Sequence, residues 1–179
     1  MELYPNAGPL ITLGKLNLLH ILSKLYSHVY ISKVVYEEVI VNGIRFGCID
    51  AFRVKLLIDD TLIVKNVIPM KVEIINVGID KGEIETIELA IGINADLILI
   101  DDWHARIEAR NQGLTVKGSL GVLYSAYKDD LINFKQFKDT LKEIAYRDDI
   151  WISGDLCMKV LDAASVLKKA SMKSKNPNQ

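Results

Sequence analysis

Two adjacent aspartates, Asp101 and Asp102, follow directly on an apolar run and are the residues best placed to do chemistry. The run, residues 97–100, reads Leu-Ile-Leu-Ile, which is typical of a strand buried on both faces of a sheet. The pair could form a polar turn where the strand meets solvent, or the strand could hold both carboxylates rigidly at a site. Carboxylate oxygens are ligands that suit Mg²⁺ or Mn²⁺.

Helical periodicity points to a third carboxylate. The segment 81–94 predicts a helix that Asp80 caps, and a rotation of about 100° per residue defines its faces. Glu83 falls at the edge of the apolar side, whereas Glu85 points almost opposite and is expected to be a solvated surface charge. The apolar side consists of Ile84, Ile87, Ala90 and Ile91.

A fourth carboxylate comes from the segment 33–41, a predicted helix that Ser32 can cap. Glu38 projects from the middle of its apolar side, which includes Val41, and Glu37 lies off that side. Taken alone, an inward glutamate is most simply a structural ion pair or a boundary charge, because a buried carboxylate is costly unless it is paired, hydrogen-bonded or bound to a cation. Two such glutamates, together with the strand-end aspartates, favour a shared cation site.

The elements that must position these residues alternate between strands and helices. A short extended piece ends at Pro5, and strands are expected at 28–31, 60–68, 96–100 and 114–117. Helices are expected at 10–25, 33–41, 44–57, 81–94 and 103–113, and the chain is helical from Gly118 on. The alternation predicts an α/β fold, a three-layer α/β/α arrangement with a central parallel sheet of about five strands. Functional sites of such sheets lie beyond the carboxyl ends of the strands.

A chain of 179 residues allows one sizeable core. A single domain is expected over 1–170, with a helical C-terminal extension at 134–170 packed on it and a disordered tail at 171–179. The formal net charge of −1 argues against duplex binding driven by global charge but leaves room for a local basic groove. No apolar run approaches the length of a membrane span, and a cytoplasmic location is expected.

Several common catalytic motifs are absent from the sequence. It contains neither a G-x-x-x-x-G-K-[ST] phosphate loop nor a G-x-G-x-x-G turn, and GSLG lacks the spacing of a nucleophile elbow. The three histidines show no zinc spacing, and Cys48 and Cys157 suggest no disulfide framework. These absences disfavour zinc chemistry, nucleotide-fold redox chemistry and triad hydrolysis.

Several stretches match a known pattern when taken together: YPNAGPLITLGKL, VYISKVVYEEVI, DKGEIETIELAIGINADLILIDDWHARIEARNQGLTVKGSLGVLYSAYKDDLI and IWISGDLCMKVL. They resemble the PIN-domain superfamily, and within it a VapC-like prokaryotic branch. The resemblance covers nearly the whole chain and is most specific in KGEIETIELA, ADLILIDD and GSLGVL. It implies a parallel sheet between helices, with acidic residues from separate elements gathered at its carboxyl edge.

The resemblance also implies one or two Mg²⁺ or Mn²⁺ ions at that edge, which activate water against an RNA phosphodiester. Carried over by position, the metal ligands are Asn6, Glu38, Glu83 and Asp102. The catalytic set is Glu38, Glu83, Asp101 and Asp102, and Asp101 is the candidate to take the proton of the attacking water.

The chain departs from the family pattern at three positions. Asn6 stands where active PIN nucleases have an aspartate, Ala7 where a hydroxyl residue usually follows, and Ser32 where a proline usually stands. Asparagine can offer a neutral carbonyl oxygen to a metal ion, but the site loses one negative charge. Ion binding should be weaker for that reason.

The resemblance implies a metal-dependent endoribonuclease of the VapC-like PIN type, with RNA as substrate, and allows a toxin role in a toxin–antitoxin pair. Such proteins commonly form homodimers and are neutralised by a small antitoxin protein. His104 and Arg106, just past the strand end, are candidate phosphate contacts, although ordinary polar residues on a solvent-facing helix are the simpler explanation. Trp103 is a candidate for stacking on a base, or a partly buried core residue.

Two other classes of function stay open. One is a PIN-like module with a depleted site that binds RNA or a partner protein without cutting. The other is a phosphotransfer or phosphatase domain that uses Asp101 and Asp102. The second is disfavoured because no aspartate follows the first strand.

Overall fold

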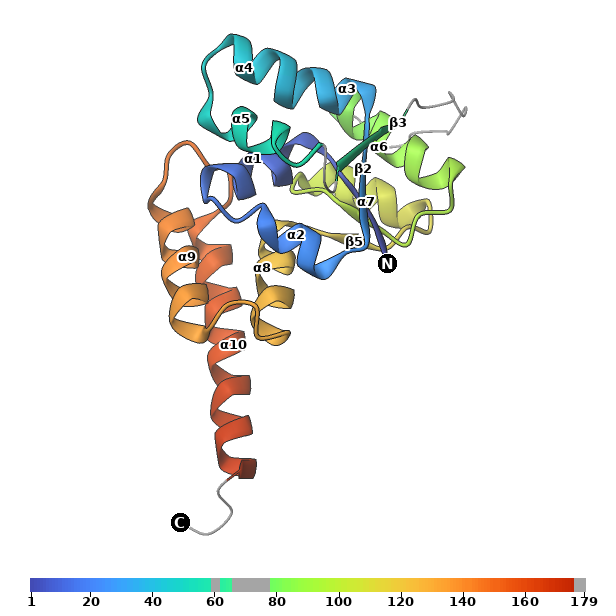
Figure 1. Cartoon of the computed structure of the whole chain (residues 1–179). Coiled ribbons are helices and arrows are strands. Elements are labelled where there is room, and N and C mark those ends of the chain that lie inside the picture. Colours follow the sequence, from blue (N-terminus) through green and yellow to red (C-terminus); the bar gives the residue numbers. More distant parts are fainter. Residues whose placement is uncertain (59–61, 66–77, 176–179) are drawn as a thin grey trace. The chain divides into compact units, whose positions relative to one another are not determined.

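The computed structural model describes residues 1–58, 62–65 and 78–175 of the chain (Figure 1). Within this part, five strands form one sheet in the order β3-β2-β1-β4-β5, and every pair is parallel. The strands are β1 (Glu2–Pro5), β2 (His28–Ser32), β3 (Leu62–Lys65), β4 (Leu97–Leu99) and β5 (Val116–Lys117). The predicted α/β fold with a parallel sheet of five strands is confirmed.

The strand order reverses between β1 and β4. From β1 the chain proceeds outward through β2 and β3, and it then crosses back to add β4 and β5 on the other side of β1. Crevices for ligands in open parallel sheets form at such a switch point, beyond the carboxyl ends of the two central strands. Asn6 follows β1 directly, and Asp101 and Asp102 follow Ile100 at the end of β4.

Side chains cover both faces of the sheet. Leu3 pairs with Leu97 and Tyr4 with Ile98, and all four side chains are buried. Because neighbouring residues of a strand point to opposite faces, each face carries one of these pairs into a core. On the face of Tyr4 and Ile98, which also carries Ile100, the helices α6 (Lys81–Gly92) and α7 (Trp103–Asn111) contribute Ile87, Leu89, Ala90, Ala105 and Ala109 to the cluster.

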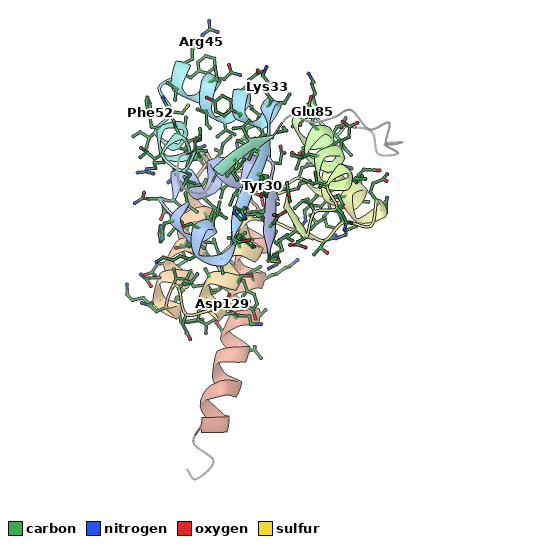
Figure 2. The ribbon with its side chains drawn as sticks, turned by 45° about the vertical axis from the view of Figure 1, so that its right-hand side comes forward. Tyr30, Lys33, Arg45, Phe52, Glu85 and Asp129 are labelled. Atoms are coloured by element: carbon green, nitrogen blue, oxygen red, sulfur yellow. The ribbon has the colours of Figure 1, made fainter. Side chains whose placement is uncertain are left out.

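Tyr4 also belongs to a small polar group near the amino ends of the strands. Its ring stacks on that of Tyr30 with centroids 5.1 Å apart, and Tyr30 is labelled on β2 in Figure 2. Both hydroxyls donate to the carboxylate of Glu2, Tyr4 at 2.9 Å and Tyr30 at 3.2 Å. Burial and the neighbouring Glu2 carboxylate raise the pKa of Tyr4, so this phenol stays protonated and serves as a hydrogen-bond donor.

The predicted helix over 10–25 is in fact two helices, and the single-helix expectation was wrong. α1 (Ala7–Lys15) and α2 (His20–Leu25) are separated by a turn in which Asn17 has φ +58°. Asparagine tolerates this left-handed conformation better than most residues. The leucines on both sides keep the apolar spacing, which is why the pattern in the sequence is continuous across the break.

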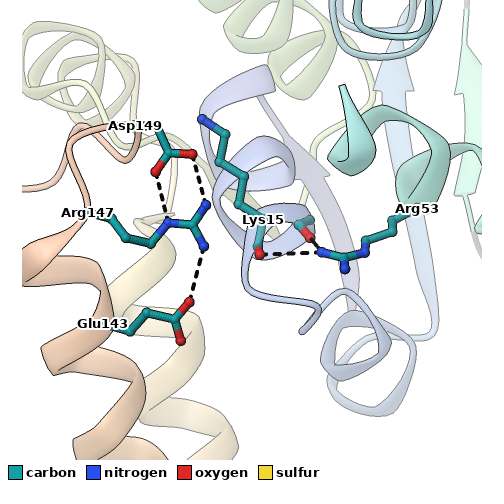
Figure 3. A network of polar contacts seen from close by, with 6 residues as sticks. Lys15, Arg53, Glu143, Arg147 and Asp149 are labelled. Atoms are coloured by element: carbon teal, nitrogen blue, oxygen red, sulfur yellow. Dashed lines mark hydrogen bonds and ion pairs between the residues drawn. The ribbon is translucent and has the colours of Figure 1, made fainter. Parts of the chain in front are cut away.

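Arg53 fixes the end of α1 to α5 (Ile49–Lys55). Its guanidinium donates to the backbone carbonyl of Gly14 at 2.7 Å and to that of Lys15 at 3.4 Å (Figure 3). Carbonyls in the last turn of a helix have no partner within the helix, and Arg53 supplies a donor to two of them, beside the N–H of Asn17 that also reaches Gly14. The two helices pack closely, because a Cβ atom on Gly14 would lie 2.8 Å from the Cβ atom of Asp50.

The helix predicted at 33–41 is confirmed, but its second part has π-helical turns in place of α-helical ones. α3 (Lys33–Tyr36) is capped by the hydroxyl of Ser32, which accepts from the N–H of Val35 at 3.1 Å. The chain continues through the π-helical segment η1 (Glu37–Asn42) into α4 (Gly43–Arg45). Val41 is 47% exposed, which contradicts its expected place on the apolar side. The wider turns of η1 rotate its residues away from an α-helical wheel.

The helix predicted over 44–57 is interrupted. α4 ends at Arg45, Gly47 has φ +72°, and α5 begins at Ile49. Glycine supplies a left-handed turn at low cost, so the chain reverses at this point. The two helices then lie so close that a Cβ atom on Gly43 would be 2.6 Å from the Cβ atom of Ala51.

The remaining helices and strands of this region follow the sequence pattern. α6 begins at the predicted cap Asp80, and α7 ends before Gly113, which has φ +80°. The strand predicted at 60–68 is β3 over Leu62–Lys65, and its other positions, 60, 61 and 66–68, lie outside the described residues. The strand predicted at 114–117 is β5, shortened to its last two residues.

The chain divides into two compact units, residues 1–121 and 122–179. The second unit holds most of α8 (Ser119–Lys128) and the packed pair α9 (Phe134–Tyr146) and α10 (Gly154–Lys175). Phe137 is fully buried in it, and its ring stacks on that of Tyr127 with centroids 5.2 Å apart. Arg147 donates to both carboxylate oxygens of Asp149 at 2.8 Å and to Glu143 at 3.1 Å, which stabilises the segment after α9 (Figure 3).

The expectation of a single domain over 1–170 stays a prediction. α10 continues through residues 171–175, and the end of the predicted tail, 176–179, lies outside the described residues. Within the described part of the chain, no helix is long and apolar enough to cross a membrane.

Candidate metal and active site

Asn6 lies at the switch point of the sheet with an unused buried oxygen. Its backbone N–H donates to the carbonyl of Leu99 at 2.8 Å, which ties the residue after β1 to the end of β4. Asn6 is only 6% exposed. It occupies the cap position of α1, but its side chain makes no capping bond. Its Oδ1 has no hydrogen-bond partner among the described residues. A buried acceptor without a partner is costly, so this oxygen is available for a ligand.

The beginning of α6 places Glu83 at the same edge. Asp80 and Glu83 form a capping box: the N–H of Glu83 donates to Asp80 Oδ1 at 2.8 Å, and the N–H of Asp80 donates to Glu83 Oε2 at 3.0 Å. Glu83 is 7% exposed, as the helical wheel predicted. Burial raises the pKa of Glu83 to about 7, with the charges of Asp80, Asp102 and Glu38 adding to the shift and the backbone bond from Asp80 opposing it.

Three oxygens gather over Gly82, one of the two residues between the partners of the capping box. A Cβ atom on Gly82 would lie 3.1 Å from Glu38 Oε2, 3.4 Å from Asn6 Oδ1 and 3.4 Å from Asp80 Oδ1. These oxygens come from η1, from the residue after β1 and from the cap of α6. We call this arrangement the Gly82 cradle. A side chain at position 82 would fill it.

Glu38 reaches the cradle from an exposed position. The sequence predicted an inward glutamate within an apolar side, but Glu38 is solvent-exposed, and its Oε2 lies over Gly82. Partial burial raises the pKa of Glu38, and the negative charge of Asp80 adds to the shift. The residue is therefore at the rim of the site and open to ligands from solvent.

Asp102 combines a structural bond with an exposed carboxylate. Its Oδ1 accepts from the N–H of Ala105 at 2.9 Å and so caps α7, while the residue as a whole is exposed. Its charge is one of those that raise the pKa of Glu83. Asp102 is thus part of the same electrostatic group as Glu83 and Glu38.

Asp101 is engaged by Ser119. Its carboxylate accepts from the backbone N–H of Ser119 at 2.7 Å and from the Ser119 hydroxyl at 2.6 Å. Burial raises the pKa of Asp101, and the bonds from Ser119 and the charge of Arg106 oppose that shift. The two adjacent aspartates therefore have different surroundings: Asp102 faces the acidic group, and Asp101 fixes the beginning of α8 to the end of β4.

The candidate substrate-binding residues also differ in their exposure to solvent. His104 and Trp103 lie exposed on the first turn of α7, Trp103 with 63% of its surface accessible, so the alternative of a core tryptophan is wrong. Arg106 is half-buried beside Asp101, and burial lowers its pKa. The Nε of Arg106 has no hydrogen-bond partner among the described residues. Arg106 is therefore not the solvent-facing residue that one alternative expected.

Glu85 is less exposed than predicted. It lies near the beginning of α6 (Figure 2) and pairs with Lys81 at 3.8 Å, and its side chain is 20% exposed. It does not take part in the Gly82 cradle.

Sequence reasoning missed three contributors to the site. Asp80 was recognised only as a helix cap, Ser119 only as part of GSLG, and Gly82 not at all. The available signals were the position of Ser119 just after the last strand and the glycine at position 82, which stands between the acidic residues 80 and 83. Neither signal identifies which groups lie opposite.

The chemistry of the donors fits a hard divalent cation. All candidates are oxygens: the amide of Asn6 and the carboxylates of Glu38, Glu83, Asp80 and Asp102. The unpartnered Asn6 Oδ1 and the cradle over Gly82 are the two observations that favour a bound ion. Among the described residues, no three side chains of the types His, Cys, Asp and Glu converge tightly enough to form a complete cage. The Gly82 cradle has two carboxylates and an amide, and Glu83 and Asp102 belong to the same electrostatic group.

Comparison with known proteins identifies the family. A family model described as PIN domain matches residues 5–166 of the chain. Among solved structures, the chain is similar to a PilT N-terminus domain protein from the hyperthermophilic archaeon Sulfolobus solfataricus, with 20% sequence identity, coverage of 70% of this chain and 93% of that chain, and a TM-score of 0.49. Curated proteins give no match. Since the family match spans most of the chain and agrees with the resemblance seen in the sequence, the chain belongs to the PIN-domain superfamily.

Proposed function

We propose that this protein is a metal-dependent endoribonuclease of the VapC-like PIN type, which hydrolyses RNA phosphodiester bonds with Mg²⁺ or Mn²⁺. The observation that carries the proposal is the oxygen of Asn6, buried and unpartnered at the switch point, where it faces the carboxylate of Glu38 across the Gly82 cradle. Membership of a superfamily that commonly has nuclease activity and generally uses divalent ions supports it.

Asn6, Glu38, Glu83 and Asp102 would hold the ion in this proposal. When bound, a divalent ion lowers the pKa of a coordinated water and offsets negative charge on the phosphate under attack. The chain itself prepares the ligands: the backbone of Ala105 fixes Asp102, and the backbone of Asp80 fixes Glu83. Glu83 must lose its proton to bind the ion, which its pKa of about 7 allows near neutral pH.

Asp101 has a positioning role in this proposal. A carboxylate that already accepts two short hydrogen bonds from Ser119 is poorly placed to take the proton of a water molecule. Glu38, exposed at the rim, is the better candidate for that step. His104, exposed at the beginning of α7, would contact the phosphate backbone of RNA, and Trp103 beside it would stack on a base.

The VapC-like resemblance adds partners to the proposal. We propose a cytoplasmic homodimer that a small antitoxin protein neutralises. Light scattering of the purified protein tests the dimer, and copurification of a small protein from the native source tests the antitoxin.

The test of the activity is cleavage of a randomised RNA pool, which avoids the choice of a wrong target. Wild-type protein with Mn²⁺ or Mg²⁺ should shorten the pool, and EDTA should stop the reaction. Asp102→Asn should remove the activity, whereas Glu85→Gln, which removes one charge on the same helix as Glu83 without touching the cradle, should retain it. Mn²⁺ binding without any cleavage would favour a module that binds RNA or protein without cutting.

A further inference from the structure

We propose that Asp80 is a direct ligand of the cation and supplies the negative charge that Asn6 does not provide. The inference rests on the proposed metal-dependent function and adds a ligand to it. In the sequence, Asp80 is recognisable only as the cap of a helix. In the structure it has two tasks: it fixes the first turn of α6 and presents an oxygen to the Gly82 cradle.

The cradle brings together ligand oxygens from three separate segments at this edge of the sheet. Asp80 Oδ1 and Asn6 Oδ1 are equally far from the point where a Cβ atom on Gly82 would lie, 3.4 Å in both cases, and Glu38 Oε2 is 3.1 Å from it. The capping box holds both carboxylates in place: Asp80 Oδ1 accepts from the N–H of Glu83, and Glu83 Oε2 accepts from the N–H of Asp80. Each of these oxygens keeps a second lone pair for an ion. The oxygen grouping over Gly82 therefore contains Asp80 together with two of the residues assigned by position, Asn6 and Glu38.

The second observation is Asn6 itself. Its side chain is buried to more than nine-tenths, and its Oδ1 is directed into the cradle without a hydrogen-bond partner in the described part of the chain. A cluster of acidic residues alone would have many explanations. A neutral acceptor left unpaired among carboxylates has no donor to bind there, and a cation is the group that would satisfy all three oxygens at once.

The negative charge of Asp80 matters for the binding of a divalent ion in the cradle. The amide of Asn6 is neutral, so without Asp80 the cradle would offer a divalent ion one negative charge, that of Glu38. Asp80 brings the cradle itself to two, beside the charges of Glu83 and Asp102 in the same electrostatic group. A helix cap does not need this charge, because asparagine caps a helix as well as aspartate does. A carboxylate at position 80, close to Glu38 and Glu83, is costly unless a cation is bound between them.

Asp80→Asn is the decisive variant, since it keeps the cap and removes the charge. Calorimetric titration of Mn²⁺ into wild-type protein should give binding, and Asp80→Asn should weaken it by about tenfold to a hundredfold. Glu85→Gln, the matched control on the same helix, should bind like wild type. Equal Mn²⁺ affinity of the wild type and Asp80→Asn would overturn the inference while leaving the proposed function intact. Absence of Mn²⁺ binding in the wild type would overturn both.

Two further variants test the cradle itself. Gly82→Ala places a methyl group where the three oxygens converge and should abolish Mn²⁺ binding, with helix content in circular dichroism unchanged. Asn6→Asp should restore Mn²⁺ affinity to the Asp80→Asn protein, because it returns one charge to the same cradle. Failure of Asn6→Asp to rescue, or full Mn²⁺ binding by Gly82→Ala, would contradict a site centred on Gly82.

Discussion

The carboxylate of Asp101 accepts two hydrogen bonds from Ser119, from the backbone N–H at 2.7 Å and from the hydroxyl at 2.6 Å. The contact joins the end of β4 to the beginning of α8. A Cβ atom on Gly118 would lie 2.8 Å from Asp101 Oδ1, so glycine at that position is what allows the close approach. Asp101 therefore contributes to the integrity of the edge on which Asp102 is mounted.

Asp101→Ala should destabilise the protein. It leaves the hydroxyl and N–H of Ser119 without an acceptor and removes the carboxylate beside the half-buried Arg106. We expect a loss of about 2–4 kcal/mol in the free energy of unfolding, measured by urea titration. Ser119→Ala removes only the hydroxyl bond and should cost about 1 kcal/mol. A loss below about 0.5 kcal/mol for Asp101→Ala would show that the contact is not structural.

Asp102→Asn should separate chemistry from stability. Asparagine caps helices as well as aspartate, so the bond to the N–H of Ala105 is retained and the melting temperature should stay close to that of wild type. RNA cleavage should fall by at least about a hundredfold, because an ion ligand has lost its charge. Wild-type cleavage by a folded Asp102→Asn protein would remove Asp102 from the proposed ligands.

The raised pKa of Glu83 predicts a pH-dependent stability. Its folded-state pKa is about 7 against an ordinary value of 4.5, so the folded state holds the proton more tightly than the unfolded state does. The resulting stabilisation is fully present below pH 4.5 and is lost as the pH rises through 7. Glu83→Gln mimics the protonated form and keeps a capping-box side chain.

In EDTA, Glu83→Gln should therefore be more stable than wild type at pH 8, by the order of 2 kcal/mol, and similar to it near pH 4.5. Urea unfolding at both pH values measures the difference in free energy of unfolding between the two proteins. The other titrating groups are the same in both, so their contributions cancel in this difference. A stability difference that does not change with pH would contradict the raised pKa. With Mn²⁺ present the order at pH 8 should reverse, since only the ionised glutamate binds the ion.

The two cysteines should differ in reactivity. Cys157 is fully buried and burial raises the pKa of its thiol, whereas Cys48 is half-buried. Ellman's reagent should titrate Cys48 in the native protein and Cys157 only after denaturation. Cys48→Ser should abolish the native reaction. Rapid native labelling of Cys157 would indicate that the α9–α10 pair opens readily.

Local sequence signals predicted the parts of the site that depend on a single element. Asp80 as a cap, Glu83 on the buried flank and Asp102 at a strand end each follow from residue type and spacing within one segment. The parallel sheet followed from the alternation of strands and helices. PIN membership followed from motifs that cover nearly the whole chain.

Contacts between elements were beyond the reach of periodicity. A helical wheel assumes α-helical turns, and the π-helical turns of η1 moved Val41 into solvent and Glu38 to the rim. Nothing in the sequence around Asp101 indicates that Ser119, eighteen residues later, binds it. The role of Gly82 depends on Glu38 and Asn6, which come from two other segments.

The π-helical segment also determines which insertions and deletions the chain can tolerate. Glu38 near its beginning must face the cradle, and Gly43 after its end must meet Ala51. Removal of one residue between them would let the backbone relax toward α-helical bonding, but it would rotate one end against the other by about 100°. Either Glu38 would then no longer face the Gly82 cradle, or Gly43 would no longer face Ala51. The length of this segment is thus fixed by two anchors, one serving the site and the other the packing of α4 on α5.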